Sequence, residues 1–270
     1  MNEYPAIALL REDVAATLGS RYAARVDAHA QRLLPFQDWP QDSFAAKLIE
    51  DVQQEMHDLF IDTAWPHCPQ HPNHPLWFDA GAWRCSTAGA AVAALGDLGA
   101  VLFNDAIEGL RRGDFDRLAP LFTGPEGHPP LILRWHRDGR FSDHAPELAE
   151  AVTNACFLGG NEVAGALIAS GVDVTAGTAT GLDALHWAAN RGQLQTVGML
   201  IALGAPLETI NRHGTTVLGT AVWSAINEPR PQHREIIEAL LDAGANVDGA
   251  AYPSGLPEID RLLEKHGATA

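Results

Sequence analysis

The sequence is poor in positive charge. Only Lys47 and Lys265 are lysines, and 18 basic residues face 34 acidic ones, which gives a formal net charge of −16. The deficit is shared, because residues 1–100 hold 6 basic and 13 acidic side chains and residues 101–270 hold 12 and 21. A field of this sign repels phosphate backbones, so we expect no nucleic acid as partner and favour a basic protein.

Long hydrophobic runs are also missing. The longest run near the start covers residues 6–10, and Arg11-Glu12-Asp13 follows it at once. This run is too short, and wrongly flanked, for a signal peptide or a membrane span. We therefore expect a cytoplasmic protein with no membrane partner. The three cysteines, Cys68, Cys85 and Cys156, are too few for a disulfide framework.

Motifs of the common enzyme classes are absent. The sequence has no nucleophile elbow, no phosphate loop, no Rossmann glycine fingerprint and no helical His-Glu-x-x-His. Its carboxylates are spread over expected helix faces and are not paired near a plausible acid or base. These observations predict that the protein is not an enzyme.

A repeat of 33 residues is present in the second half. Residues 166–173 (A-L-I-A-S-G-V-D) return as residues 199–206 (M-L-I-A-L-G-A-P), and a third copy, residues 239–246, lies one period plus seven residues further on. The best-defined unit begins G-L-D-A-L-H-W-A-A at Gly181 and ends at Ala205. It resembles the ankyrin repeat, with Asp-Ala in place of the usual Thr-Pro.

The resemblance implies an all-α fold, with a solenoid of about four ankyrin repeats over residues 101–270. The resemblance itself is strongest over residues 148–248. Residues 106–122 have the spacing of a degenerate first repeat, and residues 259–268 that of a capping outer helix. His186 occupies the family's structural histidine position, and Cys156 replaces a small packed residue. Two insertions break the period, one around residues 131–141 and one at residues 227–233, and insertions in repeat proteins map to surface loops.

The first 100 residues carry no repeat and no family resemblance. Apolar spacing predicts three amphipathic helices, the first through Leu18, the second through Leu33 and the third through Phe60. A proline-rich segment follows, and residues 76–84 read as a short β-hairpin with a glycine turn. We expect a small helical domain over residues 1–100, with a Cys- and His-rich hairpin segment at 65–86.

That hairpin segment is a candidate zinc site. Cys68 and His71 lie on one expected turn, His74 follows, and Cys85 returns at the far side of the hairpin. Two cysteines and two histidines are the usual tetrahedral ligands of one structural zinc ion, and His67 competes with His74 for the fourth place. The alternative is a proline-rich loop that holds no metal.

The resemblance also implies a concave binding surface lined by aromatic anchors. Phe157, Asn190 and Trp223 hold the same position in successive repeats, and Trp187 follows the histidine position. The full candidate set is Phe157, Trp187, Asn190, Arg191, Trp223, Glu228 and Arg230, with Trp135 and Arg137 from the longer insertion. The alternative is that the two insertions fold over the groove and bury these rings within the chain.

Taken together, the sequence indicates a non-enzymatic protein-binding module. Its sharpest form is a bacterial inhibitor or immunity protein that presents an acidic surface to a basic partner. One alternative is a metal-dependent enzyme centred on residues 67–85, which would need an open ligand position and a second catalytic group. Another is a scaffold that joins two proteins, one on each half.

Overall fold

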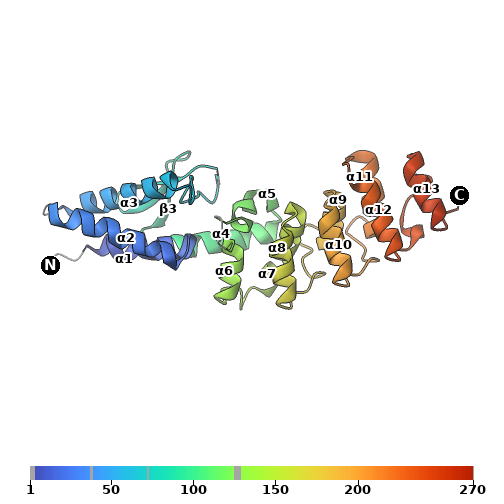
Figure 1. Ribbon diagram of the computed structural model, residues 1–270, viewed down its shortest axis with the longest axis horizontal. Coiled ribbons are helices and arrows are strands. Elements are labelled where there is room, and N and C mark those ends of the chain that lie inside the picture. The colour runs from blue at the N-terminus through green and yellow to red at the C-terminus, as the bar shows by residue number, and fades with distance from the viewer. Residues whose placement is uncertain (1–3, 37–38, 72, 125–128, 270) are drawn as a thin grey trace. The chain divides into compact units, whose positions relative to one another are not determined.

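The computed structural model describes residues 4–36, 39–71, 73–124 and 129–269, and it divides into two compact units. Unit 1 comprises residues 1–108 and 123–131, and unit 2 comprises residues 109–122 and 132–270. Helix α4 (Leu98–Arg112) runs continuously through the boundary that the sequence suggested at residue 100 (Figure 1). Among the described residues, no helix is both long and apolar enough to cross a membrane.

Three helices form most of unit 1: α1 (Pro5–Thr17), α2 (Ser20–Leu33) and α3 (Gln41–Asp58), with a short 3-10 turn, η1 (Leu34–Phe36). Their apolar positions at helical spacing face inward, and Leu10, Val26 and Met56 are fully buried. The prediction for Phe60 was wrong. It lies beyond the end of α3 with φ 52°, and its side chain is 83% exposed.

A three-stranded antiparallel sheet completes unit 1, in the order β1 (Leu76–Asp79), β2 (Ala82–Cys85) and β3 (Ala91–Ala94). The expected hairpin is confirmed, because β1 and β2 pair across a turn whose Gly81 has φ 79°. The predicted helices and hairpin of unit 1 are therefore confirmed, but the prediction lacked the third strand of the sheet. Strand β3 went unpredicted because its sequence is mostly alanine, which has a low strand propensity.

A buried carboxylate connects the sheet to the helices of unit 1. Asp13 of α1 is fully buried and accepts hydrogen bonds from Trp83 Nε1 at 2.6 Å, from the Gly96 amide at 2.8 Å and from the Leu98 amide at 2.9 Å. These donors lie on β2, on the following turn and at the start of α4. One side chain thus fixes three elements around the sheet.

Unit 2 is built from paired helices. The pairs are α7 (Ala145–Leu158) with α8 (Asn161–Ala169), α9 (Ala184–Asn190) with α10 (Leu194–Ala202), and α11 (Val217–Asn227) with α12 (His233–Asp242). Helices α7, α9 and α11 pack in succession as an inner layer, and α8, α10 and α12 pack as an outer layer (Figure 1). Small residues make this close packing possible, and Ala151, Ala155 and Cys156 in α7 are fully buried.

The ends of unit 2 are irregular. The end of α4 is followed by α5 (Phe115–Leu118) and the 3-10 turn η2 (Ala119–Phe122), which give the shortened helix pair expected for residues 106–122. At the other end, the 3-10 turn η3 (Val247–Gly249) precedes α13 (Pro257–Lys265), which packs on α12. Its apolar face, Ile259, Leu262 and Leu263, is buried, as expected for a capping helix.

The longer insertion differs from its prediction. Residues 131–141 were expected as a surface loop, but they form helix α6 (Leu131–Arg137) and a following turn. Ile132 is fully buried, Trp135 is 2% exposed and Phe141 is 3% exposed. The apolar side chains of this insertion therefore extend the core. The shorter insertion behaves as predicted, because residues 228–232 are exposed between α11 and α12.

Candidate functional sites

Cys68, His71 and Cys85 form the one cluster of potential metal ligands found among the described residues. The Nδ1 atom of His71 lies 3.7 Å from Cys68 Sγ and 3.2 Å from Cys85 Sγ, and the three ligand atoms all lie within 4.8 Å of one another. Zinc–sulfur and zinc–nitrogen bonds of about 2.3 and 2.1 Å in a tetrahedron would separate S and N by roughly 3.6 Å. The spacing therefore suits three ligands on one small ion.

The sheet register explains why the three ligands meet. Leu76 pairs with Cys85 across β1 and β2, and an isolated bridge pairs His67 with Pro75 directly before β1. The Cys68 amide donates to the His74 carbonyl at 3.1 Å, which closes the turn between them. Both the turn and Cys85 therefore lie at the same end of the sheet.

Helix α3 is hydrogen-bonded to both ends of this turn. Gln53 Nε2 donates to the carbonyl oxygens of Trp65 at 3.3 Å and Leu76 at 3.0 Å, one on each side of the turn. Cys68 is fully buried and Cys85 is 1% exposed. Burial raises the pKa of Cys68, whereas backbone donors, that of Ala88 first, lower the pKa of Cys85 to about 7. A thiolate at Cys85 is the form that binds metal.

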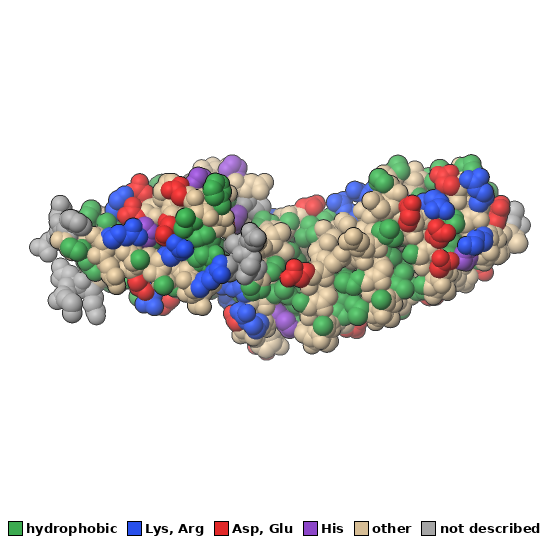
Figure 2. All heavy atoms as spheres, viewed as in Figure 1, with side chains coloured by type: hydrophobic (Ala, Val, Ile, Leu, Met, Phe, Trp, Pro, Cys, Tyr) green, Lys and Arg blue, Asp and Glu red, His purple; other side chains and the backbone are tan. Residues whose placement is uncertain are grey.

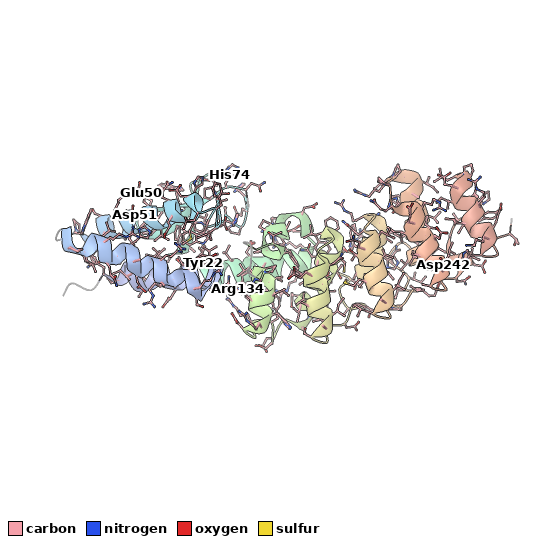
Figure 3. All side chains as sticks on the ribbon, viewed as in Figure 1. Tyr22, Glu50, Asp51, His74, Arg134 and Asp242 are labelled. Carbon is pink, nitrogen blue, oxygen red and sulfur yellow. The ribbon has the colours of Figure 1, made fainter. Side chains whose placement is uncertain are left out.

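The predicted fourth ligand is not part of the cluster. His74, labelled in Figure 3, is exposed and lies outside the group of three. Its competitor, His67, bonds through Nε2 to Asp62 Oδ2 at 3.0 Å. The sequence correctly grouped Cys68, His71 and Cys85, but spacing alone could not show which later histidine the turn directs outward.

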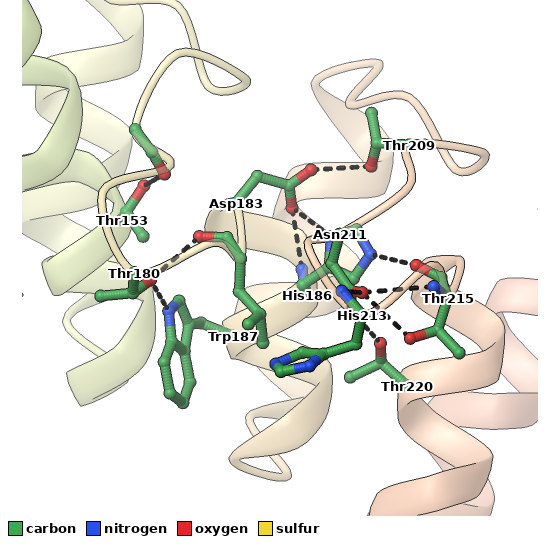
Figure 4. A network of polar contacts seen from close by, with 12 residues as sticks. Thr153, Thr180, Asp183, His186, Trp187, Thr209, Asn211, His213, Thr215 and Thr220 are labelled. Atoms are coloured by element: carbon green, nitrogen blue, oxygen red, sulfur yellow. Dashed lines mark hydrogen bonds and ion pairs between the residues drawn. The ribbon is translucent and has the colours of Figure 1, made fainter.

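A polar network surrounds His186 at the start of α9, the position for which the sequence predicted a structural histidine. The Asp183 carboxylate caps the helix by accepting from the His186 amide at 2.9 Å, and it also accepts from Thr209 Oγ1 at 2.7 Å (Figure 4). His186 Nδ1 lies 2.9 Å from Asp183 Oδ1, and Nε2 lies 3.2 Å from the Thr215 carbonyl oxygen in the next repeat. His186 is 1% exposed, so its role is to join neighbouring repeats.

The predicted aromatic anchors separate into a buried group and an exposed one. Phe157 is 7% exposed because Trp187 and Phe115 pack edge-on against it, at ring centroid distances of 5.0 and 5.6 Å. Arg191 covers the same ring, with its guanidinium carbon 4.4 Å from the centroid. Trp187 is partly buried, and its Nε1 donates to Thr180 Oγ1 at 2.7 Å (Figure 4). These rings therefore pack mainly against one another.

Two further candidates are buried. Asn190 is 9% exposed, and its Nδ2 donates to Ser224 Oγ at 2.9 Å. Its backbone carbonyl oxygen lies 3.1 Å from His233 Nε2. Trp135 belongs to the core described above, whereas Arg137, two residues later on α6, has a side chain that is 67% exposed. The expected open groove is therefore covered at Phe157 and Asn190, and the insertion candidate Trp135 is buried as well.

The exposed candidates gather around α11. Trp223 is 50% exposed, and Ile226, three residues later on the same helix face, is 41% exposed. Glu228 and Arg230 follow on the exposed turn, and the Arg230 side chain lies against Gly192, where a methyl group would come within 2.9 Å of it. The sequence reasoning missed Ile226, although its i+3 spacing from Trp223 was a signal for a shared face.

Charge is mixed on the surface near the C-terminus. Figure 2 shows acidic and basic side chains interspersed over the last helices. On α12 and α13 the acidic residues outnumber the basic ones, in line with the negative balance of the whole sequence. The acidic members are Glu235, Glu238, Asp242, Glu258, Asp260 and Glu264.

A family model matches part of unit 2. The family model for ankyrin repeats, in three copies, matches residues 152–250. An ankyrin repeat domain from Acinetobacter baumannii AYE is 22% identical, with a TM-score of 0.41, and the match covers 61% of this chain and 98% of that one. The ankyrin repeat domain of Bcl-3, a member of the IkappaB protein family, is 21% identical, with a TM-score of 0.40, and the match covers 61% of this chain and 86% of that one. No curated protein matches the chain significantly. The three successive helix pairs and the family match together identify residues 152–250 as ankyrin repeats.

Proposed function

We propose that unit 2 binds a protein partner through the exposed face of α11, with Trp223 as the central anchor. Ankyrin repeats are in general protein–protein interaction modules. The observation that carries the proposal is that Trp223 is 50% exposed, while the equivalent positions of the preceding repeats, Phe157 and Asn190, are covered. A half-exposed tryptophan beside an exposed isoleucine has the composition of a binding hot spot.

The surroundings of Trp223 define the proposed face. Ile226 extends its apolar surface along α11, and Glu228 and Arg230 supply charged groups on the turn that follows. Trp187 lies one repeat earlier and closes the buried ring cluster rather than joining this face. The interface would thus have one aromatic centre and charged edges, which is the usual layout of a protein interface.

The proposed partner is basic, and the proposed role is inhibition of the immunity type in a bacterial cytoplasm. The formal net charge of −16 supports a basic partner, because complementary charge steers association. A two-sided scaffold remains the alternative, and it would need a second partner on unit 1. Loss of all binding from one substitution at Trp223 would speak against the scaffold.

We also propose that Cys68, His71 and Cys85 bind one zinc ion. Two sulfur atoms and one imidazole nitrogen within 4.8 Å of one another are a soft donor set that zinc prefers. Elemental analysis of the full chain, purified under reducing conditions without added metal, should give about one zinc per chain. The Cys68→Ala, Cys85→Ala double variant should give none, and stoichiometric zinc in that variant would exclude this site.

The binding face can be tested with a matched pair of tryptophan variants. Trp223→Ala should weaken a captured basic partner by roughly 30-fold or more, since a hot spot carries about 2–4 kcal/mol and each decade of affinity is about 1.4 kcal/mol. Trp77→Ala is the control, because Trp77 is 46% exposed but lies on the sheet of unit 1. Equal affinities of both variants would place the site elsewhere.

Salt dependence tests the charge of the partner separately. If the partner is basic, added salt should slow association, and reversal of Glu228 to lysine should slow it further. An affinity that rises with salt would contradict a basic partner, whichever surface binds it.

A further inference from the structure

The two turns that carry the metal ligands share one feature, which is the placement of backbone amides beside each cysteine sulfur. In the first turn, the backbone amides of Gln70 and His71 lie on the side of the Cys68 sulfur and favour its thiolate form. The His71 amide donates to the Cys68 carbonyl oxygen at 3.2 Å. In the second turn, the amides of Thr87 and Ala88 donate to the Cys85 sulfur, and the Ala88 amide lies 3.2 Å from it. In both turns, the amides two and three residues after the cysteine therefore lie on the side of its sulfur.

This likeness makes His71 and Ala88 equivalent positions. Each is the third residue after its cysteine, and each has its amide on the side of that cysteine's sulfur. The first turn supplies a second ligand at this position, because the His71 ring reaches both sulfurs. The second turn carries the methyl group of Ala88 there, which cannot bind metal, and Ala88 is exposed to solvent.

No other side chain in the described part of the chain completes the set. The cluster stops at three ligands, with His74 exposed and outside it. Zinc held by three protein ligands keeps its fourth position for an external ligand, whereas four protein ligands close the site. The position left open by the second turn is the one beside Ala88, on the exposed side of the cluster.

We propose that the zinc site is open, with Cys68, His71 and Cys85 as its protein ligands and an exchangeable water molecule or small anion in the fourth position beside Ala88. This inference rests on the zinc binding proposed above and gives the ion a ligand-binding role in place of a purely structural one. A closed site would only hold the sheet together, but an open one binds an external ligand directly on the metal. Small anions and thiolates are the chemical class that such a zinc ion accepts.

Cobalt substitution of the full chain tests the open position. Co²⁺ replaces zinc in thiolate sites and gives an absorption spectrum that reports its ligands. Azide added to the reduced, cobalt-loaded wild type should shift the ligand-field bands, because azide displaces the bound water. His74→Ala should bind cobalt and respond to azide as the wild type does.

The Ala88→Cys variant supplies the missing ligand and is the decisive comparison. Its third thiolate should raise the sulfur-to-cobalt charge-transfer absorbance by about half, since two thiolates become three, and azide should no longer shift the bands. Ala88→Ser is the size-matched control and should retain the azide response. An unchanged charge-transfer band in Ala88→Cys would show that position 88 does not face the metal, and would overturn the proposal.

The remaining outcomes separate this inference from the zinc proposal itself. A wild type that binds cobalt but ignores azide, with weaker binding in His74→Ala, would mean four protein ligands; the zinc proposal would stand and the open position would be wrong. A reduced full chain that binds neither zinc nor cobalt would overturn both.

Discussion

Asp183 is the residue on which the start of α9 depends. Its carboxylate caps the helix, contacts His186 and accepts from Thr209, and it is 7% exposed. Burial alone would raise the pKa of Asp183, but hydrogen bonds and electrostatic interaction with His186, together with the Thr209 bond, outweigh burial and hold that pKa below the usual value of 3.8. The folded state therefore favours the ionised carboxylate.

This shift predicts a pH-dependent contribution to stability. A carboxyl group whose pKa is lowered by folding stabilises the fold at pH values above its unfolded pKa, and the contribution is lost as the pH falls through the folded pKa. Asp183→Asn should cost roughly 1–2 kcal/mol at pH 7. The difference from the wild type should shrink below about pH 4.

Urea unfolding at pH 7 and at pH 3 measures the stability cost of Asp183→Asn at each pH. Asp143→Asn is the control, because Asp143 is exposed at the end of the turn after α6. The control should match the wild type at both pH values. A cost for Asp183→Asn that stays constant down to pH 3 would contradict the role of its charge.

Single residues also show where sequence reasoning stops. The grouping of Cys68, His71 and Cys85 could be predicted because two short spacings and one hairpin determine it. The exclusion of His74 could not, since it depends on the direction of one side chain within a turn. The burial of Phe157 likewise depends on Phe115 and Trp187, which come from other helices, so no local pattern reports it.

At the scale of helices, α11 begins without the histidine that its neighbour uses. Thr216 caps the helix by accepting from the Gly219 amide at 3.1 Å, and its hydroxyl donates to the Gly249 carbonyl, also at 3.1 Å. Gly219 holds the histidine position, and a methyl group there would lie 2.5 Å from the Gly249 carbonyl oxygen. Close approach of the backbone thus replaces the side-chain contact made by His186.

Two glycine substitutions should therefore have opposite effects. Gly219→Ala should destabilise unit 2 by about 1–3 kcal/mol, because the neighbouring backbone has to move. Gly198→Ala, in the middle of α10, should stabilise it by roughly 0.5–1 kcal/mol, since a methyl group there meets nothing within 4 Å. Thermal unfolding followed by circular dichroism compares the two. Equal effects would contradict the proposed close approach at Gly219.

The elements that sequence reasoning missed share a physical cause. Helix α6 was taken for a loop because it interrupts the period, yet its buried Ile132 and Trp135 show that it is part of the core. Strand β3 is mostly alanine and forms a strand because it pairs with β2. Both depend on partners distant in the chain, whereas the repeat helices follow from a local period that the sequence displays three times.

At the scale of the whole molecule, the two units depend on different interactions. Unit 2 gains stability from neighbouring repeats, and a local change spreads only through adjacent helix pairs. Unit 1 is small, and its sheet has only four-residue strands. A metal ion at one end of that sheet would therefore contribute a large share of the stability of unit 1.

Removal of the proposed zinc should consequently affect unit 1 and leave the repeats unchanged. A bound ion present at a hundred times its Kd stabilises the folded state by about 2.7 kcal/mol, which corresponds to roughly 10 °C in Tm for a unit of this size. Hydrogen exchange followed by mass spectrometry shows which segments lose stability when the zinc is removed. After chelation, exchange should accelerate across residues 66–90, where the two turns lie, and stay constant across α9 to α12.

The Cys68→Ala, Cys85→Ala variant serves as the control, because without its thiolates it should already exchange rapidly in residues 66–90 and be insensitive to the chelator. The exchange of α9 to α12 in this variant should equal that of the wild type, since no metal ligand lies in those helices. Acceleration in the repeats as well would show that the two units unfold together. Unchanged exchange after confirmed loss of zinc would show that the ion does not support the sheet, and the cluster would then have to be maintained by Gln53 and the backbone bonds of its turns alone.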